Sequence, residues 1–72
     1  MNELYLDIKS RVMRLGKRLL DLEEELKKRG CRIPSTPTLT MALQGRNSSD
    51  NAQLIRRLAP IVVGEWEAEV QK

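Results

Sequence analysis

The feature that most constrains the fold is a regular spacing of apolar residues over the first third of the chain. Apolar side chains recur there at alternating intervals of three and four, with no proline among them, at Tyr5, Ile8, Val12, Leu15, Leu19, Leu22 and Leu26. This heptad spacing places them on one face of an α-helix. It predicts a long amphipathic helix over residues 2–29 that ends before Gly30, with Lys27, Lys28 and Arg29 in the last turn, where cations favour the helix dipole.

A second apolar row lies beside the first, at residues spaced seven apart: Leu6, Met13 and Leu20. Together the rows make an arc wider than a two-stranded coiled coil uses, as expected of a helix that contacts both its own domain and a partner. We therefore predict that the segment lines the core and also forms a dimer or partner interface. In a parallel pair, Arg18 would meet Glu23 of the other copy. The residues predicted for the interface are Ile8, Val12, Leu15, Leu19, Leu22 and Trp66.

Whether residues 2–29 form one helix or two stays open from the sequence. Gly16 costs about 1 kcal/mol relative to alanine in a helix interior. Asp21 followed by Glu24 resembles the start of a new helix at Leu22, which would break the segment near residue 20. The continuous heptad spacing favours one helix, straight or gently bent.

Three shorter helices are predicted in the rest of the chain, over residues 36–44, 49–59 and 60–70. The first has Thr36 as N-cap, Pro37 at its first position, a buried face of Leu39, Ala42 and Leu43, and Gly45 as its stop. Ser48 or Ser49 starts the next helix. Pro60 lacks the N–H that a helix interior needs, so it either kinks that helix or begins a final one. The prediction is a single all-α domain, residues 1–72, of four to five helices. Ile33, in the connector between the first helical segment and helix 36–44, is expected to be buried in the core.

Composition excludes several classes of protein. Cys31 is the only cysteine and histidine is absent, which excludes a disulfide framework and a Cys/His zinc site. The chain has no glycine-rich phosphate loop and no catalytic set, and the acidic run of residues 21–25 is expected on the solvent side of its helix. We therefore expect no enzyme activity, no cofactor and no metal. Since no apolar run approaches the ~20 residues of a membrane span and no signal-peptide pattern opens the chain, we expect a cytoplasmic protein.

Positive charge is concentrated in the middle of the chain. Residues 27–57 carry a single acidic residue, Asp50, against Lys27, Lys28, Arg29, Arg32, Arg46, Arg56 and Arg57, although the net charge is only +3. Lysine and arginine bind phosphates with release of counterions, so this distribution suits a nucleic-acid-binding surface around helix 36–44. An ordinary solvated surface is the alternative interpretation.

The run Thr-Leu-Thr-Met-Ala-Leu-Gln-Gly at residues 38–45 resembles the recognition helix of the helix-turn-helix domains of the lambda-repressor-like and lac-repressor-like families. Residues 51–59 resemble the helix that packs behind it in the lambda-like members. The resemblance spans residues 21–59 at most. The chain departs from the family where Gly30 is followed by a longer connector, and where the bulkier Glu24, Glu25 and Leu26 replace a small residue in the second helix.

The resemblance implies a helix-turn-helix-like core and a small DNA-binding transcriptional regulator of the type found in phages and mobile elements. Helix 36–44 would enter the major groove of double-stranded DNA, and a homodimer would present two such helices to a two-fold operator. The residues implied for base contacts are Thr38, Thr40, Met41 and Gln44, and those implied for phosphate contacts are Lys28, Arg32, Arg46 and Asn47.

A rival hypothesis is a protein-interaction module, such as an antirepressor or modulator, that binds another regulator through its amphipathic helices. The acidic C-terminal residues Glu65, Glu67 and Glu69 favour it, because they would repel phosphate but suit a protein partner. In that hypothesis Trp66 is a core or interface anchor.

Overall fold

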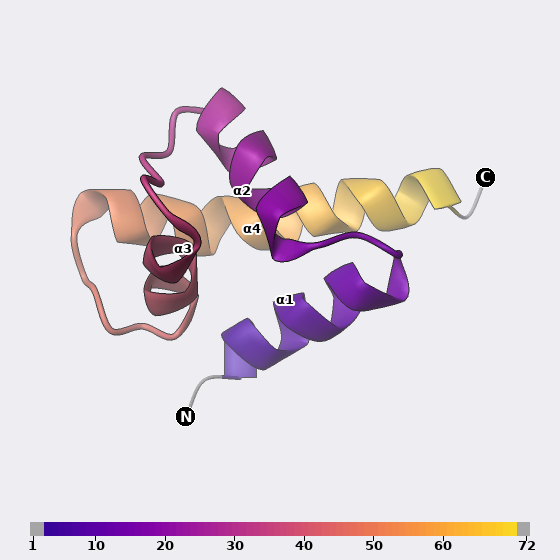
Figure 1. Cartoon of the computed structure of the whole chain (residues 1–72), viewed down its shortest axis with the longest axis horizontal. Helices are drawn as coiled ribbons and strands as arrows, with labels where there is room; N and C mark the ends of the chain where they lie inside the picture. Colours follow the sequence, from indigo (N-terminus) through magenta and orange to yellow (C-terminus); the bar gives the residue numbers. More distant parts are fainter. Residues whose placement is uncertain (1–2, 71–72) are drawn as a thin grey trace.

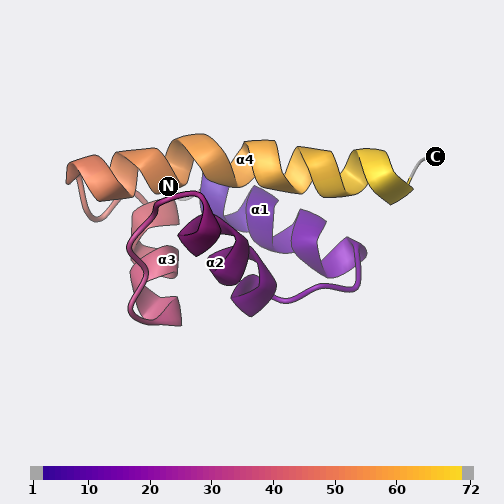
Figure 2. The same cartoon turned by 90° about the horizontal axis from the view of Figure 1, so that it is seen from above.

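The computed structural model describes residues 3–70, in which it contains four α-helices and no strand (Figure 1). The helices are α1 (Glu3–Arg14), α2 (Leu19–Lys28), α3 (Thr36–Leu43) and α4 (Asp50–Val70). α4 extends along the molecule, and the other three helices lie on the same side of it (Figure 2). Each helix contacts the other three. The all-α prediction is confirmed; residue 2, where the first helix was expected to begin, lies outside the described residues.

The long helix is C-terminal, so the prediction of a long N-terminal helix is wrong. Residues 3–28 instead form two helices, the alternative that the sequence left open, because α1 ends before Gly16, which adopts a φ of +72°. The Gly16 N–H donates to the Met13 carbonyl at 3.0 Å, and the Lys17 N–H donates to the Val12 carbonyl at 3.1 Å. This is the Schellman arrangement, which ends a helix at a left-handed residue and is most easily formed by glycine.

The second helix of the pair begins earlier than the sequence indicates. Asp21 is not its N-cap: the Asp21 carboxylate accepts a 2.8 Å hydrogen bond from the backbone N–H of Arg18, and α2 starts at Leu19. Arg18 also forms its ion pair with Asp21, and the Glu23 side chain is buried. The predicted contact between Arg18 and Glu23 of a second copy is therefore not supported.

α4 is one helix where two were predicted, over residues 49–59 and 60–70, and Pro60 lies inside it. Its start matches one predicted alternative, since the Ser49 hydroxyl accepts a 3.1 Å hydrogen bond from the N–H of Ala52. The helix continues past Pro60 because its buried stripe stays in register on both sides, at Ala52, Ile55, Ala59, Val62 and Val63. Burial of these side chains offsets the backbone hydrogen bond that proline cannot make.

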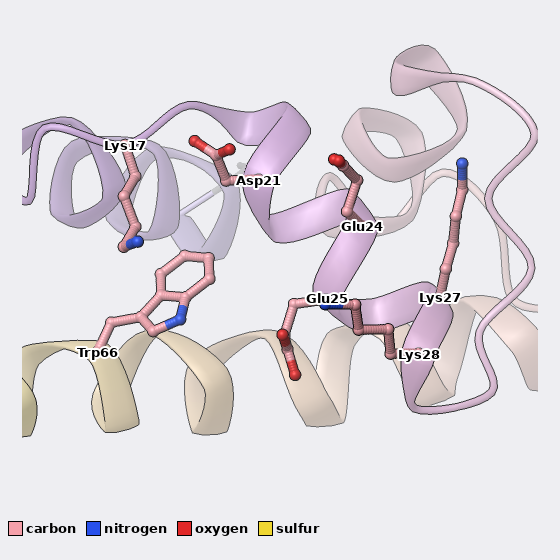
Figure 3. Close-up of a pocket in the computed structure, with 7 residues that line it drawn as sticks. All are labelled: Lys17, Asp21, Glu24, Glu25, Lys27, Lys28 and Trp66. Atoms are coloured by element: carbon pink, nitrogen blue, oxygen red, sulfur yellow. The ribbon is translucent and has the colours of Figure 1, made fainter.

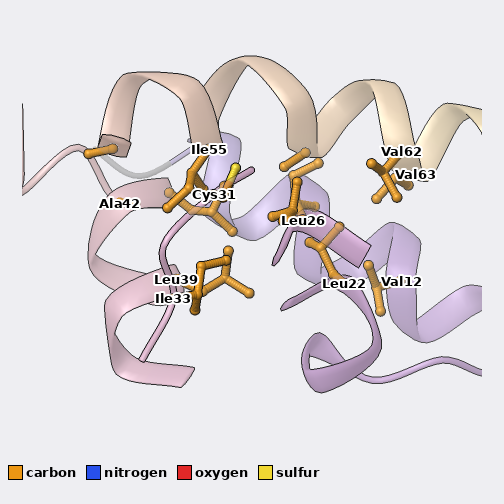
Figure 4. Close-up of a cluster of buried hydrophobic side chains, with 14 residues drawn as sticks. Val12, Leu22, Leu26, Cys31, Ile33, Leu39, Ala42, Ile55, Val62 and Val63 are labelled. Carbon is orange, nitrogen blue, oxygen red and sulfur yellow. The ribbon is translucent and has the colours of Figure 1, made fainter. Parts of the chain in front are cut away.

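The hydrophobic core draws on all four helices and on the connector before α3 (Figure 4). As predicted, Ile33 is buried, as is the face of α3 formed by Leu39, Ala42 and Leu43. Cys31, from the same connector, is buried too, and burial raises the pKa of its thiol. The connector is thus part of the core rather than a loose linker.

Within residues 3–70, no helix is both long enough and apolar enough to cross a membrane.

The predicted dimer interface is wrong for the residues of the first apolar row that are fully buried within the domain. These are Ile8, Val12 and Leu22, whose side chains the core covers, so that no surface is left for a partner. Leu15, Leu19 and Trp66 are half-buried and pack against the same core. The break at Gly16 lets α1 and α2 fold back on each other, and this buries a row that a continuous helix would have exposed.

Candidate nucleic-acid interface

The N-terminus of α3 is attached to α2 by a buried carboxylate. Thr36 is the first helical residue rather than the N-cap, which is Ser35 with extended backbone angles. The Thr36 hydroxyl instead donates a 3.0 Å hydrogen bond to Oε1 of Glu23. The other carboxylate oxygen of Glu23, Oε2, forms an ion pair with Nζ of Lys27 at 3.3 Å. A carboxylate beside a helix N-terminus is also favoured by the helix dipole.

This contact corrects the prediction that the whole acidic run of residues 21–25 lies on the solvent side of its helix. Glu23 is only 4% exposed. A separation of four residues, as between Glu23 and Lys27, allows an ion pair on one helix face. It did not indicate burial, because the Thr36 hydroxyl that completes the site comes from another helix.

The connector between α2 and α3 is held by Asn51, a residue to which the sequence assigned no role. Its side-chain amide makes both possible hydrogen bonds to the backbone of Arg32. Asn51 Oδ1 accepts from the Arg32 N–H at 2.8 Å, and Asn51 Nδ2 donates to the Arg32 carbonyl at 2.8 Å. The Arg32 backbone is therefore fixed while its side chain stays exposed.

The C-terminus of α3 is held by Arg56. Its Nη1 donates to the carbonyl oxygens of Ala42 at 3.0 Å and Asn47 at 2.7 Å, so Arg56 is turned toward α3 rather than outward to solvent. As predicted, Gly45 stops the helix, with a φ of +76°. The Asn47 side chain accepts a 3.0 Å hydrogen bond from the N–H of Ser49. Both ends of α3 are thus tied to neighbouring helices.

The outer face of α3 carries the residues predicted to contact bases. Met41 is 45% exposed, and Thr38, Thr40 and Gln44 are half-buried. The Thr38 hydroxyl lies 3.4 Å from the Ser35 hydroxyl, close enough for a hydrogen bond between them. No residue of α3 is charged, so this face has polar and apolar groups but no fixed charge of its own.

Exposed cations lie in the segments before and after α3 along the chain. Lys28, Arg32 and Arg46, the cations predicted for phosphate contacts, are exposed, and none forms an ion pair among the described residues. Arg57, one of the central cations in the sequence but not among those predicted for phosphate contacts, has the same properties and follows Arg56 on α4. The two arginines differ because neighbouring helix residues point in different directions.

Two of the three acidic residues near the C-terminus, Glu65 and Glu67, form ion pairs within the chain. Glu67 accepts hydrogen bonds from Arg11 at 2.6 and 3.0 Å, and Glu65 pairs with Arg29 at 2.5 Å. The hydrogen bonds from Arg11 hold the pKa of Glu67 below its ordinary value. These pairs tie the C-terminal half of α4 to α1 and α2, which weakens the interpretation that these glutamates await a protein partner.

A surface hollow of about 470 Å³ lies between α2 and the C-terminal half of α4 (Figure 3). Its lining mixes both signs of charge, and Nζ of Lys17 lies 4.7 Å from the centre of the Trp66 ring. None of the four residues predicted for base contacts lines it, but Lys28, one of those predicted for phosphate contacts, does. Within residues 3–70 no group of three or more Cys, Asp or Glu side chains is arranged to hold a metal ion.

No family model matches the chain, and neither a curated protein nor a solved structure shows a significant match to it.

Proposed function

We propose that this chain is a small DNA-binding transcriptional regulator of the phage or mobile-element type, cytoplasmic, whose α2 and α3 form a helix-turn-helix-like unit. α3 enters the major groove of double-stranded DNA, and α2 and α4 hold it there. The observation that carries the proposal is the combination of an uncharged outer face on α3 with exposed, unpaired cations in the segments just before and just after that helix in the sequence.

The proposed roles follow from the chemistry of each side chain. Met41 makes apolar contact with a thymine methyl group, and Thr38, Thr40 and Gln44 hydrogen-bond base edges. Lys28, Arg32, Arg46 and Asn47, with Arg57 added from the structure, contact phosphates and fix register rather than sequence. The hydrogen bonds that Glu23, Asn51 and Arg56 make to α3 and its flanking segments suit this role, because a recognition helix reads bases only when its orientation is fixed.

Fluorescence anisotropy with a pool of short duplexes, followed by competition, tests the proposal. The wild-type chain is expected to bind at low salt and to enrich particular duplexes. Gln44→Ala should lower the preference among duplexes while the melting temperature stays unchanged, since Gln44 reads bases and lies at the end of α3. Lys9→Ala, which removes an exposed cation of α1, is the matched control and should bind as the wild type does. Absence of binding at low salt contradicts the proposal.

The second candidate is a protein-interaction module that binds another regulator. It is supported by two exposed apolar side chains on α1, Leu6 and Met13. Under this alternative the chain binds no duplex at low salt, and Gln44→Ala has no effect on any measured interaction.

A further inference from the structure

The outer face of α1 carries an apolar stripe that the domain leaves uncovered. Leu6 is 62% exposed and Met13 is 65% exposed. They lie about two helical turns apart, and with Lys9, Ser10 and Arg14 they line a shallow groove of about 460 Å³. In Figure 1, α1 lies at the edge of the molecule with no helix on its outer side. Exposed apolar side chains gathered on one helix face indicate a contact surface.

Opposite charges lie at the two ends of this stripe. Glu3 and Arg14 are about three helical turns apart, so both lie on the same flank of the line from Leu6 to Met13. Both are exposed, and neither forms an ion pair among the described residues. The positive charge of Arg14 helps to lower the pKa of Glu67, but Arg14 forms no ion pair with that carboxylate. The flank therefore has an unpaired anion at one end and an unpaired cation at the other.

We propose that this face of α1 pairs, antiparallel, with α1 of a second copy of the chain. A two-fold axis through the middle of the helix brings Glu3 of each copy to Arg14 of the other. It also sets Leu6 of each copy about half a turn along the helix from Met13 of the other, so that the two stripes interleave. A parallel pairing about an axis along the helices would instead place the two charged flanks on opposite sides of the contact, so that Glu3 of one copy would not meet Arg14 of the other. The pairing of Glu3 with Arg14 therefore favours a second copy in the antiparallel direction.

The dimer is expected to be weak. A single 12-residue helix offers far less surface than the interfaces of stable dimers, so reversible association in the upper micromolar range is expected. The small Ser10 side chain in the middle of the stripe lets the two helices approach. The proposal does not rest on DNA binding and is tested without DNA.

Sedimentation equilibrium of the full chain, from about 10 μM to about 1 mM, measures the association. Glu3→Arg and Arg14→Glu are each expected to weaken it about tenfold, since each change turns two attractive pairs into repulsive ones. An equimolar mixture of the two variants is expected to regain association. In the mixed dimer the two substituted side chains face each other with opposite charges, and the unchanged Glu3 of one copy faces the unchanged Arg14 of the other. A variant that only damages the fold of its own chain is not rescued by mixing.

Two further variants test the apolar stripe. Met13→Ser is expected to weaken the dimer, whereas Val70→Ser, at a position 70% exposed on α4, is expected to leave it unchanged. Three results would each overturn the proposal. They are a wild-type chain that stays monomeric at all concentrations, a mixture of the charge variants that associates no better than either alone, and equal weakening by the two serine substitutions.

Discussion

Among single residues, Glu23 shows how one buried charge connects two helices. Its carboxylate has two partners, the Thr36 hydroxyl and the Lys27 ammonium group, and is almost fully buried. Glu23→Ala removes the acceptor for both partners. We expect a loss of about 1–3 kcal/mol in the free energy of unfolding, measured by urea denaturation.

Two variants check this assignment. Glu24→Ala changes an exposed neighbour on the same helix and should alter stability by less than about 0.5 kcal/mol. Glu23→Gln keeps an oxygen that can accept from Thr36 and should cost less than Glu23→Ala. Equal effects of Glu23→Ala and Glu24→Ala would show that the buried contact contributes nothing.

Neighbouring leucines of α2 differ in what they contribute to stability. Leu22 is fully buried and Leu20 is 41% exposed. Leu22→Ala is expected to lower the free energy of unfolding by about 2–5 kcal/mol, because the core around it relaxes only partly. Leu20→Ala should cost under about 1 kcal/mol. Chemical denaturation of the two variants side by side tests which face of α2 packs inward, and a larger loss for Leu20→Ala would reverse the assignment.

At the scale of elements, two glycines with equally open surroundings are predicted to respond in opposite directions to alanine. A Cβ atom added at Gly16 or at Gly64 would meet no other atom within 4 Å. Gly16 has a positive φ and ends α1, whereas Gly64 lies inside α4. Gly16→Ala should destabilise the domain by about 1–2 kcal/mol, and Gly64→Ala should stabilise it by about 0.5–1 kcal/mol.

The melting temperatures of the two glycine variants check this prediction. The shifts should have opposite signs relative to the wild type. If Gly16→Ala melted at the same temperature as the wild type, the left-handed end of α1 would not be required for the fold.

The attachment of α4 to α1 is predicted to depend on pH through Glu67. Hydrogen bonds from Arg11 lower the pKa of Glu67 in the folded state below its ordinary value of 4.5. The unfolded chain therefore takes up this proton first as the pH falls. The contribution of Glu67 to stability is complete above pH 4.5 and is lost as the pH falls through the lowered pKa.

Thermal unfolding of wild type and Glu67→Gln between pH 7 and pH 3 measures the effect. The two melting temperatures should differ at neutral pH and converge in acid. Glu69→Gln, which removes a carboxylate with no ion pair among the described residues, is the control and should follow the wild type at every pH. A constant difference between wild type and Glu67→Gln would show that the ion pair does not titrate in this range.

At the scale of the whole molecule, the arrangement of charge matters more than its sum. The net charge is only +3, yet much of the acidic charge is engaged in pairs within the chain, as with Glu65 and Glu67. Lys28, Arg32, Arg46 and Arg57 remain exposed and unpaired among the described residues. This separation leaves unpaired cations in the segments before and after α3, which the net charge alone does not reveal.

If these cations bind phosphates, DNA affinity should fall steeply with salt. Each phosphate contact contributes a slope of about −0.9 in the logarithm of affinity against the logarithm of salt concentration. Arg46→Ala should weaken binding to all duplexes alike and make the slope shallower by about 1, without changing the melting temperature. Anisotropy titrations over a salt series measure both quantities. An unchanged slope would remove Arg46 from the phosphate-contact set.

Local sequence determined the features that depend on neighbours along the chain. The all-α class followed from apolar periodicity, and Leu39, Ala42 and Leu43 were identified as the buried face of α3 from their spacing alone. Gly45 as the stop of α3 and Ser49 as a candidate start of α4 were predictable too. In each case the responsible interaction lies within about one helical turn, so the sequence contains it directly.

Tertiary structure decided the features that depend on residues distant in sequence. Heptad spacing is the same whether a helix is continuous or broken at Gly16, so the sequence left both open, and the break appears only in the folded chain, where α1 and α2 pack into one core. Pro60 locally signals a helix boundary. α4 nevertheless continues through Pro60, because side chains on both sides of it are buried in the same core. Glu23, Asn51 and Arg56 gained their roles from partners 9 to 19 residues away, across helix boundaries. Such contacts form only after the chain folds, because folding alone brings those groups together.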